Sequence, residues 1–167
     1  TEKKQLADLR AVSDKIIDTS KYTVHELKAG IMEIARKTKG KVSMRIQVVS
    51  FGFKYGVPHD ADLIIDVRFL ANPYFVSKLK PLDGNHPKIK KFVLNHPETQ
   101  EFLNKYMDLL DYLIPLYEKE GKAYLTIGVG CTGGRHRSVT IAGAIFDHVR
   151  KTKNQIQIVH RDIHQPA

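Results

Sequence analysis

The sequence predicts a single α/β domain with a mixed or mostly parallel sheet flanked by helices. Three observations support this prediction. Segments with the apolar period of strands interleave with segments that have the period of helices. A compact β-prone run leads through a glycine-rich turn into a helical pattern, which is the order of a βα unit. With 167 residues, 42% of them hydrophobic and 27% charged, the chain is long enough for one domain with a buried core.

Residues 1–40 are expected to form a polar lead-in followed by a helix, ahead of a domain that spans 41–167. Thr1 to Tyr22 has no clean apolar period. Apolar residues from Val24 to Ile34 fall on one helical face, and Thr23 with Glu26 has the spacing of a capping box. Gly40 is the expected end of this helix.

Four segments of the remaining chain are expected to be extended. Val42 to Val48 and Leu63 to Leu70 alternate apolar and polar residues, the second run being broken by Asn72-Pro73. Tyr124 to Val129 is a β-prone run, and Ile156 with Ile158 suggests a closing strand. The first and second strands are therefore separated from the third by a long stretch of chain.

Two helices are expected in this part of the chain, with a loop before them. Pro81 to Pro87 is rich in turn residues and is expected to be a long loop. A helix begins near Pro97 and ends near Gly121, and Pro115 is expected to kink or shorten it. A second helical pattern runs from Val139 to Val149.

The chain is strongly basic, and this charge makes polyanions and anionic metabolites candidate partners. Its 27 Lys and Arg against 18 Asp and Glu give a net charge of +9. Such an excess attracts nucleic acid. Lysines that only keep the surface solvated would explain the charge equally well.

Several function classes are excluded on composition. No run approaches the roughly 18 apolar residues of a membrane span, and the charged start lacks a signal-peptide core, so a cytoplasmic protein is expected. One cysteine forms no internal disulfide. No metal and no cofactor are expected, because the histidines lack a metal-ligand spacing. They are interpreted as surface or loop residues: His59, His86, His96, His148, His160 and His164.

The segment from Gly130 to Ser138 carries the strongest functional pattern. It lies between a predicted buried strand and a predicted helix, where backbone N–H groups lack partners and the helix dipole is positive. Gly133 and Gly134 allow close approach of a ligand, and three basic residues and a serine follow: Arg135, His136, Arg137 and Ser138. We therefore predict a phosphate-binding loop. The alternative is a tight turn whose glycines serve only packing.

The same loop also has the C-x5-R-S spacing of cysteine-dependent phosphatases, with Cys131 as nucleophile and Arg137 as the phosphate ligand. Such enzymes also need a carboxylic acid for the leaving group, for which Asp60, Asp62 and Asp66 are candidates. They usually carry a histidine directly before the cysteine, where this sequence has Gly130. A phosphatase therefore stands as an alternative function.

Asp66 and Arg68 have two interpretations. They can form a charge pair at the end of a strand. If their strand lies parallel and adjacent to the one that ends before Cys131, they and Asn72 can instead face the loop, since open α/β sheets bind ligands at their carboxyl edge. Asp66 would then suit an amine or sugar hydroxyls, and Arg68 an acid or phosphate.

Three separated motifs resemble one family closely: residues 50–56 (SFGFKYG), residues 60–73 (DADLIIDVRFLANP) and residues 130–138 (GCTGGRHRS). Across about 41–161 the sequence is similar to the C-terminal domain of the RapZ/YvcJ family, the bacterial RNase adapter proteins. Family members carry an N-terminal domain that hydrolyses ATP or GTP. Residues 1–40 would then be a remnant of that domain or a linker from it. No G-x-x-x-x-G-K-[ST] motif occurs in this sequence.

The resemblance implies a regulatory module without catalysis of its own. It would sense an amino-sugar phosphate such as glucosamine 6-phosphate, bind small regulatory RNA and present it to an RNase or another regulatory protein. Self-association into a homo-oligomer is also expected. The resemblance places these residues around the ligand: Asp66, Arg68, Tyr124, Cys131, Thr132, Gly133, Gly134, His136 and Arg137. The basic residues Arg150, Lys151, Lys153 and Arg161 are either an RNA-binding patch or a solvated helix end.

Overall fold

The computed structural model describes residue 13 and residues 16–39 and 44–165. The chain divides into two compact units, Thr1–Val42 and Ser43–Ala167, which are described separately. The first contains a short 3-10 helix, η1 (Thr19–Lys21), and a helix, α2 (Val24–Lys39). The expected capping box is confirmed: Thr23 N donates to Glu26 Oε2 (2.8 Å), and Glu26 N donates to Thr23 Oγ1 (3.3 Å). The predictions made for residues 1–12, Gly40 and Val42 lie outside the described residues.

The second unit is an α/β domain, in which strands and helices follow one another along the chain. Its elements are β1 (Arg45–Gly52), η2 (Phe53–Tyr55), β2 (Leu63–Asp66), η3 (Pro73–Phe75), α3 (Pro87–Leu94), α4 (Pro97–Glu120), β3 (Tyr124–Cys131), α5 (Arg137–Val149) and β4 (Ile156–His160). The strands form one sheet in the order β2-β3-β1-β4, and every neighbouring pair is parallel. The α/β prediction is confirmed, with a fully parallel sheet.

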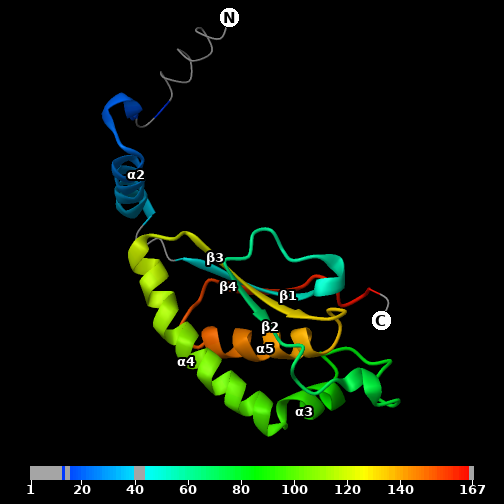
Figure 1. Cartoon of the computed structure of the whole chain (residues 1–167). Coiled ribbons are helices and arrows are strands. Elements are labelled where there is room, and N and C mark those ends of the chain that lie inside the picture. The colour runs from blue at the N-terminus through cyan, green and yellow to red at the C-terminus, as the bar shows by residue number, and fades with distance from the viewer. Residues whose placement is uncertain (1–12, 14–15, 40–43, 166–167) are drawn as a thin grey trace, which may run out of the picture. The chain divides into compact units, whose positions relative to one another are not determined.

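The helices of this unit lie against the sheet and against one another. Figure 1 shows α5 along the sheet, with α4 and α3 beyond it, and α5 packs on β1, β3 and β4. Parallel central strands are buried along both faces, which explains why the alternation predicted for β1 holds at Arg45 and Gln47 and then gives way to continuous burial from Val48. The core contains Val48, Ile127 and Ile145, all fully buried.

Two of the expected elements differ in the structure, each for a local reason. The second strand stops at Asp66 instead of Leu70, because the Asp66 carboxylate accepts the Arg68 N–H at 2.9 Å and turns the chain. Residues 81–86 form the expected loop, but they lead into a helix that was not predicted, α3, whose start is capped by His86 Nδ1 accepting from Lys88 N at 3.2 Å.

The helix that carries Pro115 is not shortened. It continues to Glu120 and ends on Gly121, which adopts the left-handed conformation at φ 86°. Buried Leu110 and Ile114 hold this turn against the core, and such packing outweighs the loss of one N–H group at the proline. In the described part of the chain, no helix is long and apolar enough to cross a membrane.

Candidate ligand-binding site

The carboxyl ends of three strands meet at one edge of the sheet. In the parallel register Gly52 of β1 lies opposite Cys131 of β3, and Asp66 of β2 lies opposite Gly130. The strand that ends at Asp66 therefore lies next to the strand that leads into the loop, because β2 and β3 are adjacent and parallel. The loop of residues 132–136 connects this edge to the start of α5 at Arg137, which is the usual place for a ligand in an open α/β sheet.

The backbone of this loop keeps its donors free. Its carbonyls are used: Thr132 O accepts from Lys54 N (3.1 Å) and Arg135 O accepts from Gly84 N (2.8 Å). No N–H group of residues 132–136 donates to a protein acceptor among the described residues. A run of unsatisfied amides at a helix N-terminus is an anion-binding arrangement, because the amides and the helix dipole both favour negative charge.

The two loop glycines have different roles. Gly134 has φ 75°, and a Cβ there would lie 2.6 Å from the backbone nitrogen of Gly52. Gly52 N itself donates to the buried Asp162 carboxylate at 2.7 Å, so the loop packs backbone to backbone on a fixed neighbour. A Cβ on Gly133, by contrast, would meet nothing within 4 Å. Close packing therefore explains why residue 134 is a glycine, but it does not explain the glycine at position 133.

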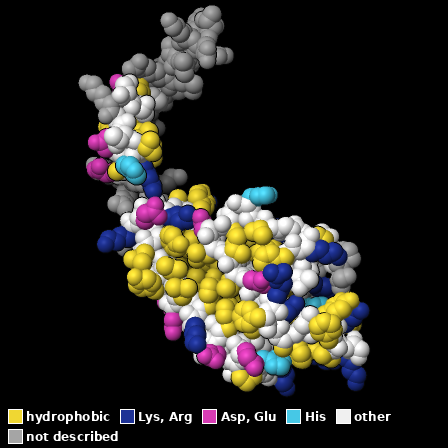
Figure 2. All heavy atoms as spheres, viewed as in Figure 1, with side chains coloured by type: hydrophobic (Ala, Val, Ile, Leu, Met, Phe, Trp, Pro, Cys, Tyr) yellow, Lys and Arg dark blue, Asp and Glu magenta, His cyan; other side chains and the backbone are white. Residues whose placement is uncertain are grey.

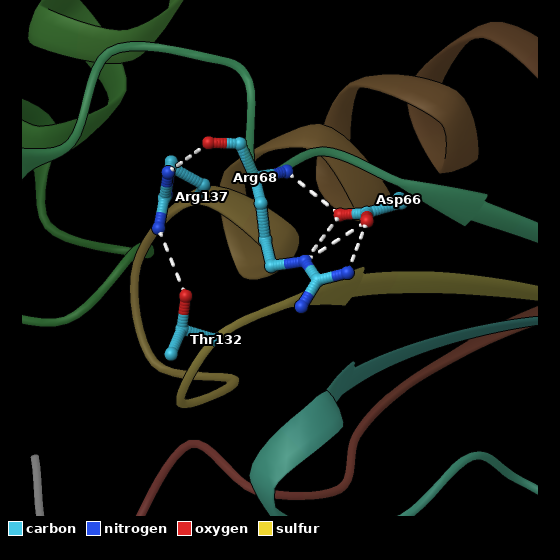
Figure 3. Close-up of polar contacts among 4 residues, drawn as sticks. All are labelled: Asp66, Arg68, Thr132 and Arg137. Atoms are coloured by element: carbon cyan, nitrogen blue, oxygen red, sulfur yellow. Dashed lines mark hydrogen bonds and ion pairs between the residues drawn. The ribbon is translucent and has the colours of Figure 1, made fainter.

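The guanidinium of Arg137 is held inside the site (Figure 3). Its side chain is buried, and Nη1 donates to the backbone oxygens of Arg68 (2.6 Å) and Leu70 (3.1 Å). Nη2 donates to Thr132 Oγ1 at 3.4 Å. Burial lowers the pKa of Arg137, yet a guanidinium remains charged in proteins. The N–H on Nε and the second N–H on Nη2 find no protein acceptor in the described part of the chain and remain available to an anion.

Cys131 is buried at the base of the loop, with Sγ 3.1 Å from Ser138 Oγ. The residue before it cannot carry a side chain here. A Cβ on Gly130 would lie 2.5 Å from the ring of Phe53 and 2.6 Å from the ring of Phe51. The packing of these two rings therefore excludes the histidine that the phosphatase pattern usually has at this position.

Asp66 and Arg68 pair with each other. Arg68 Nε and Nη2 donate to the two carboxylate oxygens at 2.7–3.0 Å, as Figure 3 shows. The hydrogen bonds from Arg68 lower the pKa of Asp66, which therefore stays ionised. The Arg68 guanidinium also lies 4.4 Å from the centre of the Phe53 ring. The structure thus shows the charge pair that was one of the two interpretations.

A cavity of about 390 Å³ opens beside the loop, within the range of small-molecule sites. Five of the predicted residues line it: Cys131, Thr132, Gly133, His136 and Arg137. Arg135 of the predicted loop and Asn72, which was expected to be able to face it, also line the cavity, together with three residues that were not predicted: Lys54, Tyr74 and Phe75. Because open α/β sheets bind ligands at the carboxyl ends of their strands, the segments that follow β1 and β2 could have been searched for site residues, and they contain Lys54 and Tyr74. Asp66, Arg68, Gly134 and Ser138 lie close by without lining the cavity.

Tyr124 lies elsewhere. It begins β3, at the amino edge of the sheet, and lines a separate cleft with Arg45 and Gln47. Within one chain the structure therefore does not bring Tyr124 to the loop.

Three histidines, His136, His148 and His160, form side-chain hydrogen bonds with other residues of the domain. His136 is buried with Nε2 2.6 Å from Leu82 O, and desolvation lowers its pKa, so the imidazole is neutral at pH 7. His160 belongs to β4 and lies 2.9 Å from Ser50 Oγ, and His148 pairs with Asp111 on α4 at 2.9 Å. The surface or loop interpretation was wrong for His160, a part-buried strand residue, while His148 is a partly exposed residue of α5. Among the described residues no group of three or more His, Cys, Asp or Glu could hold a metal ion.

The proposed RNA-binding residues are mostly neutralised. Arg150 pairs with Asp147 (3.2 Å), and Lys153 pairs with Glu118 (2.7 Å). Arg161 pairs with Asp162 (2.7 Å) and donates to the backbone oxygen of Gly56. Each pair reduces the positive charge that a phosphate backbone would meet.

Fold and site together define the chain as a parallel α/β domain with a glycine-rich C-x5-R-S loop at the carboxyl edge of its sheet. A family model described as the RapZ C-terminal domain matches residues 44–164. The chain belongs to the RapZ family and corresponds to its C-terminal domain.

Curated relatives agree with this assignment. The chain is 57% identical over 164 residues to a nucleotide-binding protein of Desulforapulum autotrophicum, covering 98% of this chain and 56% of that protein. It is 52% identical to a nucleotide-binding protein of Desulfosudis oleivorans (97% and 56% covered) and 47% identical to one of Thermoanaerobacter (97% and 57% covered). The chain thus spans little more than half the length of these relatives.

Proposed function

We propose that this domain is a regulatory sensor whose loop binds the phosphate of a phosphorylated amino sugar, such as glucosamine 6-phosphate. The observation that carries the proposal is the run of free amides at residues 132–136 beside the buried guanidinium of Arg137. A phosphate seated there would gain charge-assisted hydrogen bonds from the guanidinium and from the loop amides. It would also lie on the positive end of α5.

The rest of the cavity suits a sugar. Asn72 and Lys54 supply polar groups, and the ring of Tyr74 offers an apolar wall with a hydroxyl. Asp66 supplies a nearby carboxylate for an ammonium group, although both of its oxygens already accept hydrogen bonds from Arg68. Selectivity for the amine would therefore require that pair to open or to share the carboxylate.

Calorimetry tests the proposal directly. We expect glucosamine 6-phosphate and glucose 6-phosphate to bind and unphosphorylated glucosamine to give no signal, because the phosphate supplies most of the contacts. Glucosamine is the matched control, since it keeps the ring and the amine. Absence of binding by either phosphate at millimolar concentration would contradict the proposal.

The partners follow as proposals for the whole protein. We infer that small RNA and an RNase or other regulatory protein bind this domain in the cytoplasm, that the domain self-associates, and that the nucleotide site of the relatives belongs to the part of the protein outside this chain. The net charge of +9 supports RNA binding. A salt titration of RNA affinity checks it, because phosphate contacts give a log–log slope of about −0.7 per contact on single strands.

The Cys131 Sγ–Ser138 Oγ contact favours a second candidate, a cysteine phosphatase. The thiolate would attack phosphorus, the P–O bond to the alcohol would break, and water would then release phosphate from the cysteine. We nevertheless expect wild-type protein not to turn over an aryl phosphate. Among the described residues, no carboxylate lines the cavity to protonate a leaving group, and Asp66 is held by Arg68.

The measurement is turnover by wild-type protein and by Cys131→Ser. Turnover that disappears in this variant would establish the phosphatase and refute the assignment of the domain as non-catalytic. The variant should still bind a sugar phosphate, because Ser occupies nearly the volume of Cys and the amides remain in place.

A further inference from the structure

A second hollow of about 590 Å³ lies between the segment that follows η3 and the helix α3. We name it the lysine groove and define it by six of its lining residues: Val76, Lys78, Leu79, Lys88, Lys91 and Phe92. It is separate from the loop cavity, with which it shares no lining residue. In Figure 2, dark blue Lys and Arg side chains border yellow apolar ones at this end of the molecule.

The rim of the groove carries positive charge without compensation. Lys78, Lys88 and Lys91 are exposed, and none of them has an ion-pair partner among the described residues. Residues 73–96 contain these three, Lys80 and Lys90, against the lone carboxylate of Asp83. Uncompensated like charges repel one another, so this face favours an anionic partner.

The floor of the groove is aliphatic and aromatic. Val76 is 37% exposed, while Leu79 and Phe92 are half-buried and pack on the core. The Phe92 ring meets His96 edge to face at 5.1 Å between centroids. A basic rim above an apolar floor is typical of a groove that binds an amphipathic segment.

The chemistry favours protein over RNA as the occupant. Nucleic-acid surfaces combine exposed ring faces for base stacking with guanidinium groups that grip phosphates. In the described part of the chain no arginine lines the groove, and the aliphatic side chains of Val76 and Leu79 form no hydrogen bond with a phosphodiester. The same two side chains would bury Leu, Ile or Val from a peptide.

We propose that the lysine groove docks a short amphipathic segment of a partner protein that presents carboxylates beside aliphatic side chains. The lysines steer the acidic face, and the apolar floor receives the aliphatic face. The proposal does not depend on sugar-phosphate binding by the loop, since the two sites have separate linings.

Fluorescence anisotropy with the full chain tests the proposal. The probe is a labelled helical peptide with a Leu/Ile stripe flanked by Glu, and its control is the same peptide with Lys in place of Glu. We expect the acidic peptide alone to bind, with micromolar affinity. The double substitution Lys88→Glu/Lys91→Glu should lower the affinity for the acidic peptide about tenfold or more, because two charges that attract its carboxylates become charges that repel them. Arg150→Glu/Lys151→Glu is the matched control, with the same change in net charge on another face, and should change affinity less than about twofold.

Val76→Ser separates the two contributions. This substitution should lower the affinity for the acidic peptide several-fold, since part of the apolar floor is lost. Binding of neither peptide at millimolar concentration would overturn the proposal. Binding of a single-stranded RNA oligonucleotide or of anionic vesicles would also overturn it, provided that this binding is lost in Lys88→Glu/Lys91→Glu and unchanged in Val76→Ser. Calorimetry with glucosamine 6-phosphate should give the same result in all three variants, so failure of this proposal is distinguishable from failure of the loop assignment.

Discussion

Replacing Arg137 by alanine is expected to abolish binding of sugar phosphates. Arg137 is a buried cation that lines the loop cavity, and its remaining N–H groups supply charge-assisted hydrogen bonds of about 1.5–3 kcal/mol each. Loss of two such bonds corresponds to a fall in affinity of roughly 100-fold or more. Calorimetry with glucosamine 6-phosphate measures it.

Arg137→Ala should also destabilise the fold. The backbone oxygens of Arg68 and Leu70 would lose the hydrogen bonds that both accept from Nη1. One buried and one part-buried carbonyl without partners correspond to roughly 2–4 kcal/mol of the free energy of unfolding. Urea titration measures this loss, and binding is compared at a temperature where the variant remains folded.

Arg68→Ala is the matched control. It removes the same side-chain type from the same edge of the sheet, but this guanidinium pairs with Asp66 and does not line the cavity. We expect affinity to change less than about threefold, as for other exposed pairs. Loss of binding in Arg68→Ala together with normal binding in Arg137→Ala would contradict the assignment of the phosphate to the loop.

Replacing Gly134 by alanine is expected to disrupt the loop itself. The position requires φ 75°, and the added Cβ would lie 2.6 Å from Gly52 N and 2.8 Å from Asp162 Cβ. The left-handed conformation alone costs about 1–2 kcal/mol for a residue with a side chain, and the clash is with backbone that cannot turn away. We expect a loss of roughly 3 kcal/mol or more in the free energy of unfolding, measured by denaturant titration, and loss of sugar-phosphate binding.

Gly133→Ala separates strain from ligand contact. Its Cβ meets nothing within 4 Å and its φ is not positive, so stability should change by less than about 1 kcal/mol. If the ligand sits on this amide, affinity should fall while stability is kept. Equal destabilisation by both substitutions would contradict the geometry described for the loop.

The loop could be predicted from the sequence because its chemistry is local. A buried strand, two glycines, three basic residues and a helix start follow one another within about a dozen positions. The backbone N–H groups at a helix start are unsatisfied wherever that helix lies in the fold. Cys131, Gly133, His136 and Arg137 could therefore be predicted from the loop itself, and Thr132 from the family resemblance, and the structure brings all five to one cavity.

The sequence by itself determined the α/β class, the βα loop and the capping of α2, since each depends on residues close together along the chain. Only the tertiary structure decided the strand order β2-β3-β1-β4, the separation of Tyr124 from the loop, and the joining of Lys54 and Tyr74 to it. Only the structure also showed that Arg150, Lys153 and Arg161 form ion pairs, whereas Lys78, Lys88 and Lys91 form none with the residues that the structure describes. The physical reason is that sheet order and ion pairing join residues tens of positions apart, and no local pattern of apolar period or turn residues encodes which distant segments will pack together.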